Sequence, residues 1–483
     1  MALDYVGFSE GRWLRAAHLT INPELRTWLA SMTPFRSPSN PIVLRADPEA
    51  LGLSEAADAI WQRRDKLVGL VATDTDISLL NIEVIRTDLD LEEGRLVEVS
   101  IGTAPVLYQI VNGLTKEEII QQKNTRGFVR AEAKKIGTWR EDRQRFEIIR
   151  WVPSPNAPVF LVDTAEPAPT RNAIGYLPGT NYHVTIEDID ALVTHNSAIL
   201  GILGAGKTYL ALELVERMIA ARIKVICLDL TNQYAEQLAP YYQLEQSRID
   251  IEELQAIGRT GKDNVQLNVE EGGSTKPFKT KVSELLRSFL DPGTTQYLRI
   301  FNPVQFEVWR QDSKPYAGRA SMATLTPTEI TRIFTESILE ILQELGMSES
   351  AKCCLVFEEA HSLIPEWNAV ASEGDKTATN GTAKAILQGR KYGLGCMVIT
   401  QRTANVTKSI LNQCNTVFAL RVFDATGVEF LSNYIGSDYA GVLSTLEDRN
   451  AIVFGRASSC RNPVLIRLNN RDDFRLIFRA PTA

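Results

Sequence analysis

The sequence predicts an α/β protein in which a smaller all-β domain precedes a mainly parallel sheet. From about residue 185 onward, continuous apolar runs alternate with helical patterns, as expected for parallel strands covered on both faces. Between residues 95 and 162, short runs of alternating apolar and polar side chains are separated by Gly, Pro or Asn, which favours a small barrel or sandwich. With 483 residues, the chain is long enough for several domains.

Composition narrows the class of protein only slightly. Apolar residues make up 44% and charged residues 23%, as in ordinary globular proteins. The net charge of −7 gives no overall basic footprint, although a ring could line a narrow channel with lysine while its outside stays acidic. The six cysteines form no C-x-x-C pair, which favours buried reduced thiols over zinc or disulfides. We expect a cytoplasmic protein with no membrane partner, because Asp4 and Glu10 interrupt the first residues and no apolar run is long enough to span a bilayer.

The N-terminal third is expected to contain three parts. Residues 1–90 form a mixed segment of unknown role, with a Pro/Ser-rich turn at Pro34–Pro41 and helical spacing over Ser54–Leu67. Residues 91–165 form the β domain, and the proline-rich range 166–190 forms a linker. The expected strands of the β domain are Leu96–Ile101, Val106–Val111, Gly127–Ala131, Phe146–Val152 and Val159–Val162.

The α/β core is expected over residues 191–470, with a tail over 471–483. A helix is expected over Pro327–Leu345, because Thr326 and Glu329 form a capping box around a proline at the first helical position. The range 231–350 is too long for one crossover and indicates a largely helical insertion, and the polar stretches 259–281 and 366–382 indicate mobile loops. The expected strands are Val225–Asp229, Cys353–Phe357, Cys396–Thr400, Thr416–Leu420, Ala451–Phe454 and Pro463–Leu468.

The run Gly201-Ile-Leu-Gly-Ala-Gly-Lys-Thr208 fits the phosphate-cradling pattern G-x-x-x-x-G-K-[ST]. An apolar run precedes it and helical spacing over Tyr209–Arg222 follows it, so its backbone N–H groups would converge on phosphates at a helix N-terminus. Lys207 would reach the β- and γ-phosphates, and the Thr208 hydroxyl would bind Mg²⁺. We expect a nucleoside triphosphate site here, in preference to a glycine-rich turn that happens to contain lysine. The expected binding residues are Gly201, Gly204, Ala205, Gly206, Lys207, Thr208 and Tyr209.

Two carboxylates, Glu358 and Glu359, follow the expected strand Cys353–Phe357. Ligands of open α/β sheets bind at the carboxyl ends of the strands, where these side chains would lie. Glu358 would hold the hydration shell of Mg²⁺, and Glu359 would act as the base for the attacking water. The alternative is a solvated acidic strand end.

Two further residues have side chains suited to phosphate chemistry. Gln401 follows the strand Cys396–Thr400 and could contact the γ-phosphate or the attacking water. Arg390 lies where glycines end a short helix, and its rigid, permanently charged guanidinium suits a γ-phosphate across a subunit boundary. For Arg390, the alternative is a cation that complements the helix C-terminus.

Taken together, these motifs resemble the HerA/FtsK group of hexameric DNA-translocating ATPases, and HerA in particular. The resemblance covers about residues 90–483 and depends on an ordered set of motifs, each at the end of an expected strand or helix. Residues 1–90 lie outside it. The motifs are Ala198–Thr208, Asp229–Tyr234, Glu358–Pro365, Gly389–Gly395, Thr400–Arg402 and Asn412–Thr416.

The resemblance implies a RecA-like ATPase core that uses ATP and Mg²⁺. It also implies that the 91–165 domain is a HerA-type assembly barrel and that the tail, 471–483, braces neighbouring subunits. Thr208 and Glu358 would serve the metal, Glu359 would be the catalytic base, Gln401 the sensor, and Arg390 an arginine finger supplied in trans. The implied catalytic residues are thus Glu359, Glu358, Gln401 and Arg390.

Three positions depart from the family pattern. Glu358 stands where Asp is usual, which adds a methylene to its reach. Gln233 stands where Glu is frequent, which removes a charge near the nucleotide. His195-Asn196 occupies the place of a common Arg-His pair, so a second trans-acting arginine is expected to be missing. These departures predict an ATPase that is slow or that depends on a partner.

The partners implied by the resemblance are identical subunits in a hexamer, double-stranded DNA in the central channel, and a separate effector. That effector would be a nuclease of the NurA type, another nuclease, or a Sir2-like protein, with roles in DNA end processing or antiviral defence. The N-terminal barrel would dock it. Candidate channel lysines, each of which has a solvated surface residue as its alternative, are Lys262, Lys276, Lys279, Lys281 and Lys376.

Two other classes of function remain open from the sequence. One is an ATP-responsive ring that organises an effector without translocating, which the departures at His195, Gln233 and Glu358 favour. The other is a P-loop kinase or metabolic NTPase, which predicts a monomer or dimer in place of a hexamer.

Overall fold

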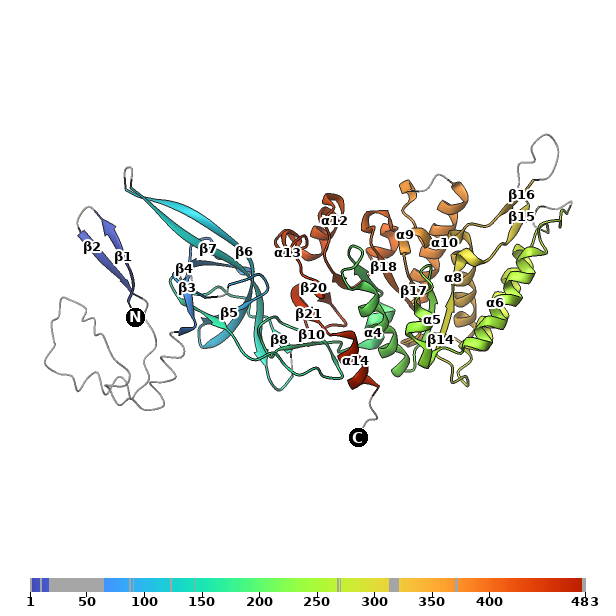
Figure 1. The fold of residues 1–483 in the computed structure, drawn as a ribbon, viewed down its shortest axis with the longest axis horizontal. Coiled ribbons are helices and arrows are strands. Elements are labelled where there is room, and N and C mark those ends of the chain that lie inside the picture. The colour runs from blue at the N-terminus through green and yellow to red at the C-terminus, as the bar shows by residue number, and fades with distance from the viewer. Residues whose placement is uncertain are drawn as a thin grey trace. The chain divides into compact units, whose positions relative to one another are not determined.

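The computed structural model describes residues 2–8, 11–16, 65–86, 88–89, 91–121, 124–143, 145–266, 269, 271–311, 321–369 and 372–479 (Figure 1). It divides into two compact units, of which the first is Met1–Ala168 with Tyr176–His183 and the second is Pro169–Gly175 with Val184–Ala483. The turn expected at Pro34–Pro41, and residues 54–64 of the expected helix, lie outside the described residues.

The first unit is built around a closed barrel of six antiparallel strands. Their order is β4-β3-β9-β5-β6-β7, and β7 pairs back to β4 through Leu80↔Ala133 and Ile82↔Ala131, which closes the wall. Closure leaves no free strand edge in the barrel. The strands are β3 (Leu67–Val71), β4 (Leu79–Val84), β5 (Leu96–Ile101), β6 (Ala104–Gln121), β7 (Asn124–Arg140) and β9 (Pro158–Val162); β8 (Arg145–Glu147) extends the pairing of β7, and β1 (Ala2–Phe8) forms a separate hairpin with β2 (Gly11–Ala16).

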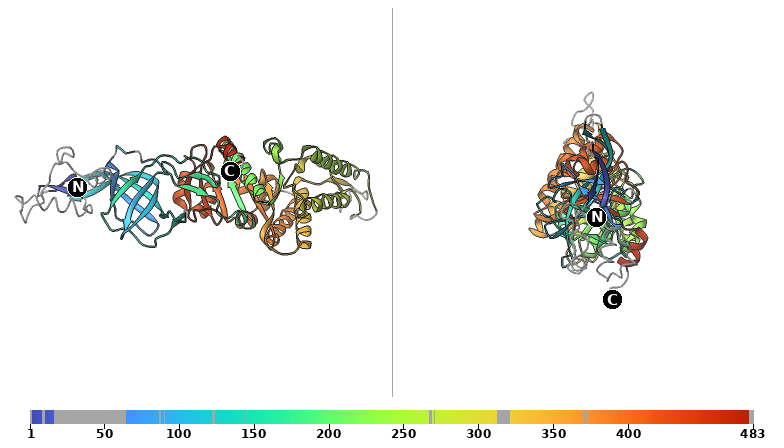
Figure 2. Two further views of the ribbon diagram at one scale, coloured as in Figure 1. Left: turned by 90° about the horizontal axis from the view of Figure 1, so that it is seen from below. Right: turned by 90° about the vertical axis from the view of Figure 1, so that its left-hand side faces the viewer.

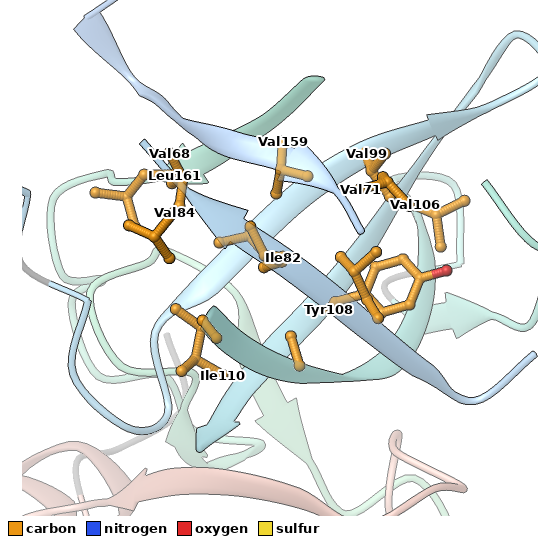
Figure 3. Packing of buried hydrophobic residues seen from close by; sticks show 14 residues of the cluster. Val68, Val71, Ile82, Val84, Val99, Val106, Tyr108, Ile110, Val159 and Leu161 are labelled. Atoms are coloured by element: carbon orange, nitrogen blue, oxygen red, sulfur yellow. The ribbon is translucent and has the colours of Figure 1, made fainter. Parts of the chain in front are cut away.

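Side chains fill the interior of the barrel (Figure 3). Val68, Ile82, Tyr108 and Val159 are fully buried there, in one cluster with other aliphatic side chains. Burial also raises the pKa of the Tyr108 phenol. The barrel is therefore a packed core, and the surface that it offers to other molecules is its outer face.

The barrel begins closer to the N-terminus than the expected range of 91–165. Strands β3 and β4 both precede residue 91. All five residues of β3 are buried, so the strand lacks the apolar–polar alternation that marks a half-exposed strand in a sequence.

The second unit is organised by a ten-stranded sheet of order β11-β10-β21-β20-β19-β12-β18-β17-β13-β14, which confirms the predicted α/β core. From β19 to β14, neighbouring strands run parallel, so their carboxyl ends meet at one edge of the sheet and their amino ends at the other. The range expected as a linker contributes β10 and β11. The strands are β10 (Ala173–Tyr176), β11 (His183–Thr185), β12 (Ser197–Leu200), β13 (Lys224–Leu228), β14 (Leu298–Phe301), β17 (Ser348–Phe357), β18 (Tyr392–Thr400), β19 (Thr416–Ala419), β20 (Asn450–Gly455) and β21 (Val464–Leu468).

The orientation expected for β20 and β21 is wrong, because both take part in antiparallel pairs. Strand β20 pairs antiparallel with β19 and with β21. Only the eight residues between Gly455 and Val464 join β20 to β21, and a parallel crossover needs a dozen or more. The carboxyl end of β20 consequently lies beside the amino end of β19, through the pair Thr416↔Gly455.

The helices pack on this sheet and on one another. Helix α4 packs on β12 and β13, α10 packs on α8 and β18, and the expected capping box at the start of α8 is present at Thr326 and Glu329. The helices are α3 (Ile189–Thr194), α4 (Lys207–Ala220), α5 (Tyr234–Gln237), α6 (Leu244–Arg259), α7 (Thr275–Leu290), α8 (Pro327–Glu344), α9 (Ala360–Leu363), α10 (Glu373–Gly389), α11 (Lys408–Leu411), α12 (Ala425–Ile435), α13 (Ser437–Val442) and α14 (Arg471–Phe478), with short 3₁₀ turns at Ala239–Tyr241, Pro303–Gln305, Trp367–Ala369 and Thr403–Asn405.

The 231–350 range contains more than helices. It includes strand β14 of the sheet and an antiparallel pair of β15 (Trp309–Gln311) with β16 (Met322–Thr324). It also includes the helices α6 and α7, which pack on each other (yellow-green in Figure 2). The loops expected at 259–281 and 366–382 are partly helical, because α7 and α10 begin within them. A serine N-cap, with Ser372 accepting from Gly374 and Asp375, starts α10 inside a stretch whose polar composition suggests a loop.

All six cysteines are buried and free, as expected. Burial raises the pKa of the Cys353, Cys414 and Cys460 thiols to about 12, so they stay protonated and unreactive. Within the described ranges, no helix has both the length and the apolar character needed to cross a membrane.

Candidate nucleotide site

The phosphate loop joins the central strand β12 to helix α4 at the carboxyl edge of the sheet. Gly204 and Gly206 have φ angles of 82° and 100°, which side chains with a Cβ rarely adopt. The backbone N–H of Ile202 donates to the Arg421 carbonyl at 2.9 Å, which ties the loop to the segment after β19. The glycines of the motif therefore stand where the loop needs them to turn.

Lys207 is buried at the first position of α4, with Thr208 half-buried beside it and Tyr209 exposed. Its Nζ donates to the Ile202 carbonyl at 2.8 Å. Burial lowers the pKa of Lys207, while the charges of Glu359 and Glu358 oppose that shift. The Lys207 ammonium thus interacts electrostatically with both carboxylates, as expected for residues that the sequence motifs assign to one site.

Glu358 is 3% exposed at the end of β17 and accepts a 2.6 Å hydrogen bond from the Tyr234 hydroxyl. Burial is the main cause that raises the pKa of Glu358 to about 7, and the charges of Asp229 and Glu359 add to it. The Tyr234 hydrogen bond and Lys207 pull the pKa down but only partly compensate. This carboxyl therefore holds its proton to a higher pH than an ordinary glutamate does.

Asp229 orders the turn that presents Tyr234 to Glu358. Its carboxylate accepts from the Thr231 backbone N–H (2.8 Å), the Thr231 hydroxyl (2.6 Å) and the Tyr234 backbone N–H (3.0 Å). Burial and the nearby Glu358 raise the pKa of Tyr234 well above its ordinary value, so the phenol remains a donor. Gln233 is exposed in this turn and brings no charge to it.

Glu359 and Gln401 lie together. Gln401 Nε2 donates to Glu359 Oε1 at 3.2 Å, although the two residues leave different strands. The other carboxylate oxygen, Oε2, is buried and makes no hydrogen bond with any described residue, while His361 Nδ1 lies 3.2 Å away. Glu359 also adopts a φ of 54°, a conformation that is strained for a non-glycine residue. The unpaired oxygen of a constrained carboxylate suits a water molecule that must lose a proton.

These residues fit a nucleotide that carries Mg²⁺. The loop offers backbone donors, Lys207 offers a buried ammonium, and Glu359 offers a carboxylate oxygen that accepts no hydrogen bond from the described residues. Among the residues that the structure describes, no group of three or more His, Cys, Asp or Glu side chains could hold a metal. A cation at this site would thus rely on phosphate and water oxygens in addition to Thr208 and Glu358, which is how Mg²⁺ is commonly bound.

Arg390 lies apart from these residues, at the amino edge of the sheet. It follows α10 and precedes β18, whereas Gln401 follows the same strand at its carboxyl end. Nine residues in an extended strand span about 30 Å, so Arg390 does not reach the phosphate loop of its own chain.

His195 holds Arg390 together with a second arginine, Arg456. Arg390 Nη2 lies 2.5 Å and Arg456 Nη1 3.1 Å from His195 Nε2. His195 Nδ1 lies 3.1 Å from the Thr194 hydroxyl, which itself donates to the Asp190 carbonyl. The ring must therefore be neutral, with Nδ1 protonated and Nε2 accepting from both guanidinium groups. Burial, Arg390 and Arg456 all lower the pKa of His195, in agreement with this assignment.

Sequence reasoning missed Tyr234 and Arg456. Tyr234 stands inside a quoted motif, but its bond to Glu358 joins residues that are 124 positions apart. Arg456 follows β20, which was expected to run in the opposite direction, so its place beside His195 could not be inferred. The sequence signal that could have found it is the short link between the last two strands.

The candidate channel lysines are only partly available to other molecules. Three of them form ion pairs within the chain: Lys279 with Glu340, Lys281 with Glu253 and Lys376 with Glu373, each at 2.8 Å. Lys262 lies over the Trp309 ring, 5.8 Å from its centroid.

Comparison with known proteins agrees with the motif reading. Residues 172–351 match the family described as helicase HerA, central domain. A DNA double-strand break repair helicase HerA from Sulfolobus acidocaldarius is 21% identical over 376 residues, which are 66% of this chain and 74% of that protein. The same-named protein from Pyrococcus furiosus is 27% identical over 124 residues, covering 25% of this chain and only 21% of the relative.

Among solved structures, the genome packaging NTPase B204 from Sulfolobus turreted icosahedral virus 2, in complex with ATP-gammaS, aligns over 57% of this chain and 99% of its own. Its sequence identity is 12% and the TM-score is 0.34.

Proposed function

Because residues 172–351 match the helicase HerA central-domain family, we propose that this chain is an ATP-hydrolysing motor that acts on double-stranded DNA as a ring of identical subunits. The observation that carries the proposal is the convergence of the phosphate loop, Glu359 and Gln401 at the carboxyl edge of the parallel part of the sheet. Three separate segments supply this set, and each would have a role in phosphoryl transfer.

Within one subunit, the division of labour follows from the positions of the side chains. The loop and Lys207 would bind the β- and γ-phosphates. Glu359, whose Oε2 accepts no hydrogen bond from the described residues, would take the proton of the attacking water, and Gln401 would orient that carboxylate through its Oε1. Loss or gain of the γ-phosphate would then change the position of Gln401, and β18 would transmit this change along the sheet.

Thr208 and Glu358 would hold Mg²⁺, directly and through water. The cation would neutralise charge that develops on the phosphates. Glu358 is suited to this only when ionised, and its bond with Tyr234 keeps one oxygen fixed while the other remains free to accept from metal-bound water.

The second half of the proposed site comes from a neighbouring subunit. Arg390 cannot reach its own phosphate loop, and His195 together with Arg456 holds its guanidinium at the opposite edge of the sheet. A ring in which the amino edge of one chain faces the carboxyl edge of the next would bring Arg390 to the γ-phosphate. The separation of Arg390 from its own phosphate loop therefore supports a ring of identical subunits, and we propose a hexamer.

The remaining assignments also belong to this proposal. The packed barrel would serve ring assembly and would dock an effector, either a nuclease or a Sir2-like protein, on its outer face, and residues 471–483 would brace adjacent subunits. Lys262 and Lys276 are better candidates for DNA phosphates than the three ion-paired lysines. A role in DNA end processing or antiviral defence would depend on the effector.

The proposal can be tested by measuring ATP hydrolysis with and without duplex DNA, and translocation by displacement of a third strand from a triplex. We expect duplex-stimulated hydrolysis and displacement in the wild type, and neither in Glu359→Gln. Hydrolysis that does not respond to duplex DNA, together with a monomeric or dimeric mass in the presence of ATP, would contradict the proposal and favour a metabolic NTPase.

A second candidate, an ATP-responsive scaffold, is favoured by the departures at His195, Gln233 and Glu358. Gln233 brings no charge to the turn beside the site, and Glu358 uses one of its oxygens to accept from the Tyr234 hydroxyl. Under this alternative, Glu359→Gln would abolish hydrolysis and leave activation of the effector intact. Under the motor proposal, both activities would fall together.

A further inference from the structure

Arg456 lies outside every motif that carries the family resemblance, yet its backbone is fixed at the amino edge of the sheet. The preceding Gly455 has a φ of 127°, and a Cβ there would lie 2.1 Å from the Asn415 carbonyl oxygen, so glycine alone fits. The Arg456 backbone N–H donates to Asn415 Oδ1 at 3.0 Å, and the Ala457 N–H donates to Thr416 Oγ1 at 3.3 Å. The start of β19 and the residue before it therefore hold Arg456 in one position.

The Arg456 and Arg390 side chains are both exposed, and both guanidinium groups contact the same atom, His195 Nε2. Neither arginine forms an ion pair with a carboxylate among the residues that the structure describes. Two permanent positive charges thus share the lone pair of one neutral ring, and they repel each other. Most of the N–H donors of each guanidinium remain free. An anion with several acceptor oxygens would offset the repulsion and accept from these donors.

A cavity of about 230 Å³ opens beside this pair and has room for a phosphate group. His195 and Arg390 line it, together with Asn412, Gln413 and Asn415. Within the described chain, no lining residue carries a carboxylate. An anion that enters the cavity would therefore meet positive charge and amide groups without a competing negative side chain.

We propose that Arg456 is a second catalytic residue of the shared site: together with Arg390, it contacts the γ-phosphate of the nucleotide bound by the neighbouring chain. The inference rests on the proposed function, because it needs that phosphate to reach the amino edge. Each guanidinium binds a different phosphate oxygen, and His195 holds the two groups in place before the phosphate arrives. Charge on the transferring phosphoryl group is spread over several oxygens, so two cations stabilise it better than one.

A purely orienting role, in which Arg456 acts only through Arg390, is the alternative that a double variant separates. Single-turnover ATP hydrolysis is measured on the full chain, with and without duplex DNA, for Arg456→Ala, Arg390→Ala and the two changes together. Arg461→Ala is the matched control, since this exposed arginine lies on the same link between β20 and β21. Arg456→Lys keeps a cation and removes the planar, forked donor group.

We expect Arg456→Ala to lower the hydrolysis rate roughly 10²-fold with ATP affinity unchanged, and Arg456→Lys to lower it less. The double variant should hydrolyse ATP roughly tenfold more slowly than Arg390→Ala, or slower still, because each arginine contacts the phosphate directly. A double variant that matches Arg390→Ala would overturn the inference. So would equal rates for Arg456→Ala and Arg461→Ala, or a loss that appears only with duplex DNA, which would assign Arg456 to the DNA backbone.

Failure of the proposed function would give a different pattern. A wild type that does not hydrolyse ATP, or an Arg390→Ala variant as active as wild type, would overturn the shared site itself and this inference with it. If Arg456→Ala fails to fold, the comparison of Arg456→Lys with Arg461→Lys decides the outcome: equal rates would overturn the inference, and a slower Arg456→Lys would support it.

Discussion

The two edges of the ten-stranded sheet differ in the charged side chains that they carry. At the carboxyl edge, Glu358 and Glu359 surround Lys207. At the amino edge, Arg390 and Arg456 converge on a neutral His195, and neither arginine has a carboxylate ion-pair partner in the described part of the chain. Strand β18 connects the two edges, with Arg390 before its first residue and Gln401 after its last. Because Arg390 does not reach the phosphate loop of its own chain, we propose that two chains bring these edges together.

The largest effect is expected from removing the proposed finger. Arg390→Ala should lower ATP hydrolysis by roughly 10³-fold, because an arginine finger stabilises charge on the transferring phosphoryl group. ATP affinity should change little, since the loop of the same chain is untouched. The adjacent, exposed Lys391→Ala is the control. A similar loss of hydrolysis in Arg390→Ala and Lys391→Ala would show that the amino edge contributes only through its overall positive charge.

At the opposite edge, Glu359→Gln should reduce hydrolysis by about 10²–10³-fold, because it removes the base without removing a hydrogen-bond acceptor for Gln401. ATP should still bind. Glu349→Gln, on the exposed amino end of the same strand, is the matched control. Near-normal turnover in Glu359→Gln would mean that another group accepts the proton.

The parts of these edges that could be predicted share a physical basis. The phosphate loop is contiguous in sequence, and Glu359 and Gln401 each directly follow an apolar strand, so the rule that parallel carboxyl ends meet places them together. That rule does not predict the position of Arg456, because this residue follows an antiparallel strand. It also does not predict the hydrogen bond of Tyr234, whose partner Glu358 lies 124 residues away in the sequence.

The errors along the chain have similarly local explanations. Strand β3 is buried on both faces and so lacks the alternation of apolar and polar residues. The sequence pattern therefore did not reveal that the barrel begins before residue 91. Polar composition predicted loops where α7 and α10 begin. Helix α10 starts at the capping residue Ser372, whereas α7 has no side-chain cap and is stabilised by the burial of its apolar face, and average polarity reveals neither feature.

A smaller effect is expected from the residue that orients the arginines. His195→Ala should lower the rate of ATP hydrolysis roughly tenfold, which corresponds to the loss of one hydrogen bond to a charged group, and ATP affinity should not change.

The pH dependence of hydrolysis tests the same role. Because the pKa of His195 is lowered, the ring is neutral at pH 7. At acidic pH the ring becomes protonated, so that Nε2 can no longer accept a hydrogen bond and a third positive charge joins the two arginines. Wild-type hydrolysis should therefore fall at acidic pH by a step that His195→Gln lacks. Identical pH profiles for the two proteins would argue against an orienting role.

The smallest effect concerns Glu358. Its pKa of about 7 lies above the ordinary value, so the carboxyl becomes ionised, and able to serve Mg²⁺, as pH rises through 7. Magnesium should increase ATP affinity by a factor that grows a few-fold between about pH 6 and pH 8 in wild type, and Glu358→Gln should show no such rise.

The same ionisation has the opposite effect on the free energy of unfolding. The ligand-free protein should lose stability as pH rises toward 7, because the folded state holds the proton of Glu358 more tightly than the unfolded chain does.

Mixing two inactive proteins tests most directly whether the edges belong to one shared site. Arg390→Ala and Glu359→Gln subunits are combined at varied ratios, and ATP hydrolysis is measured. A shared site predicts recovered activity in mixed rings, because some interfaces then join an intact carboxyl edge to an intact amino edge. No recovery at any ratio, with mixed rings confirmed by mass, would contradict the account.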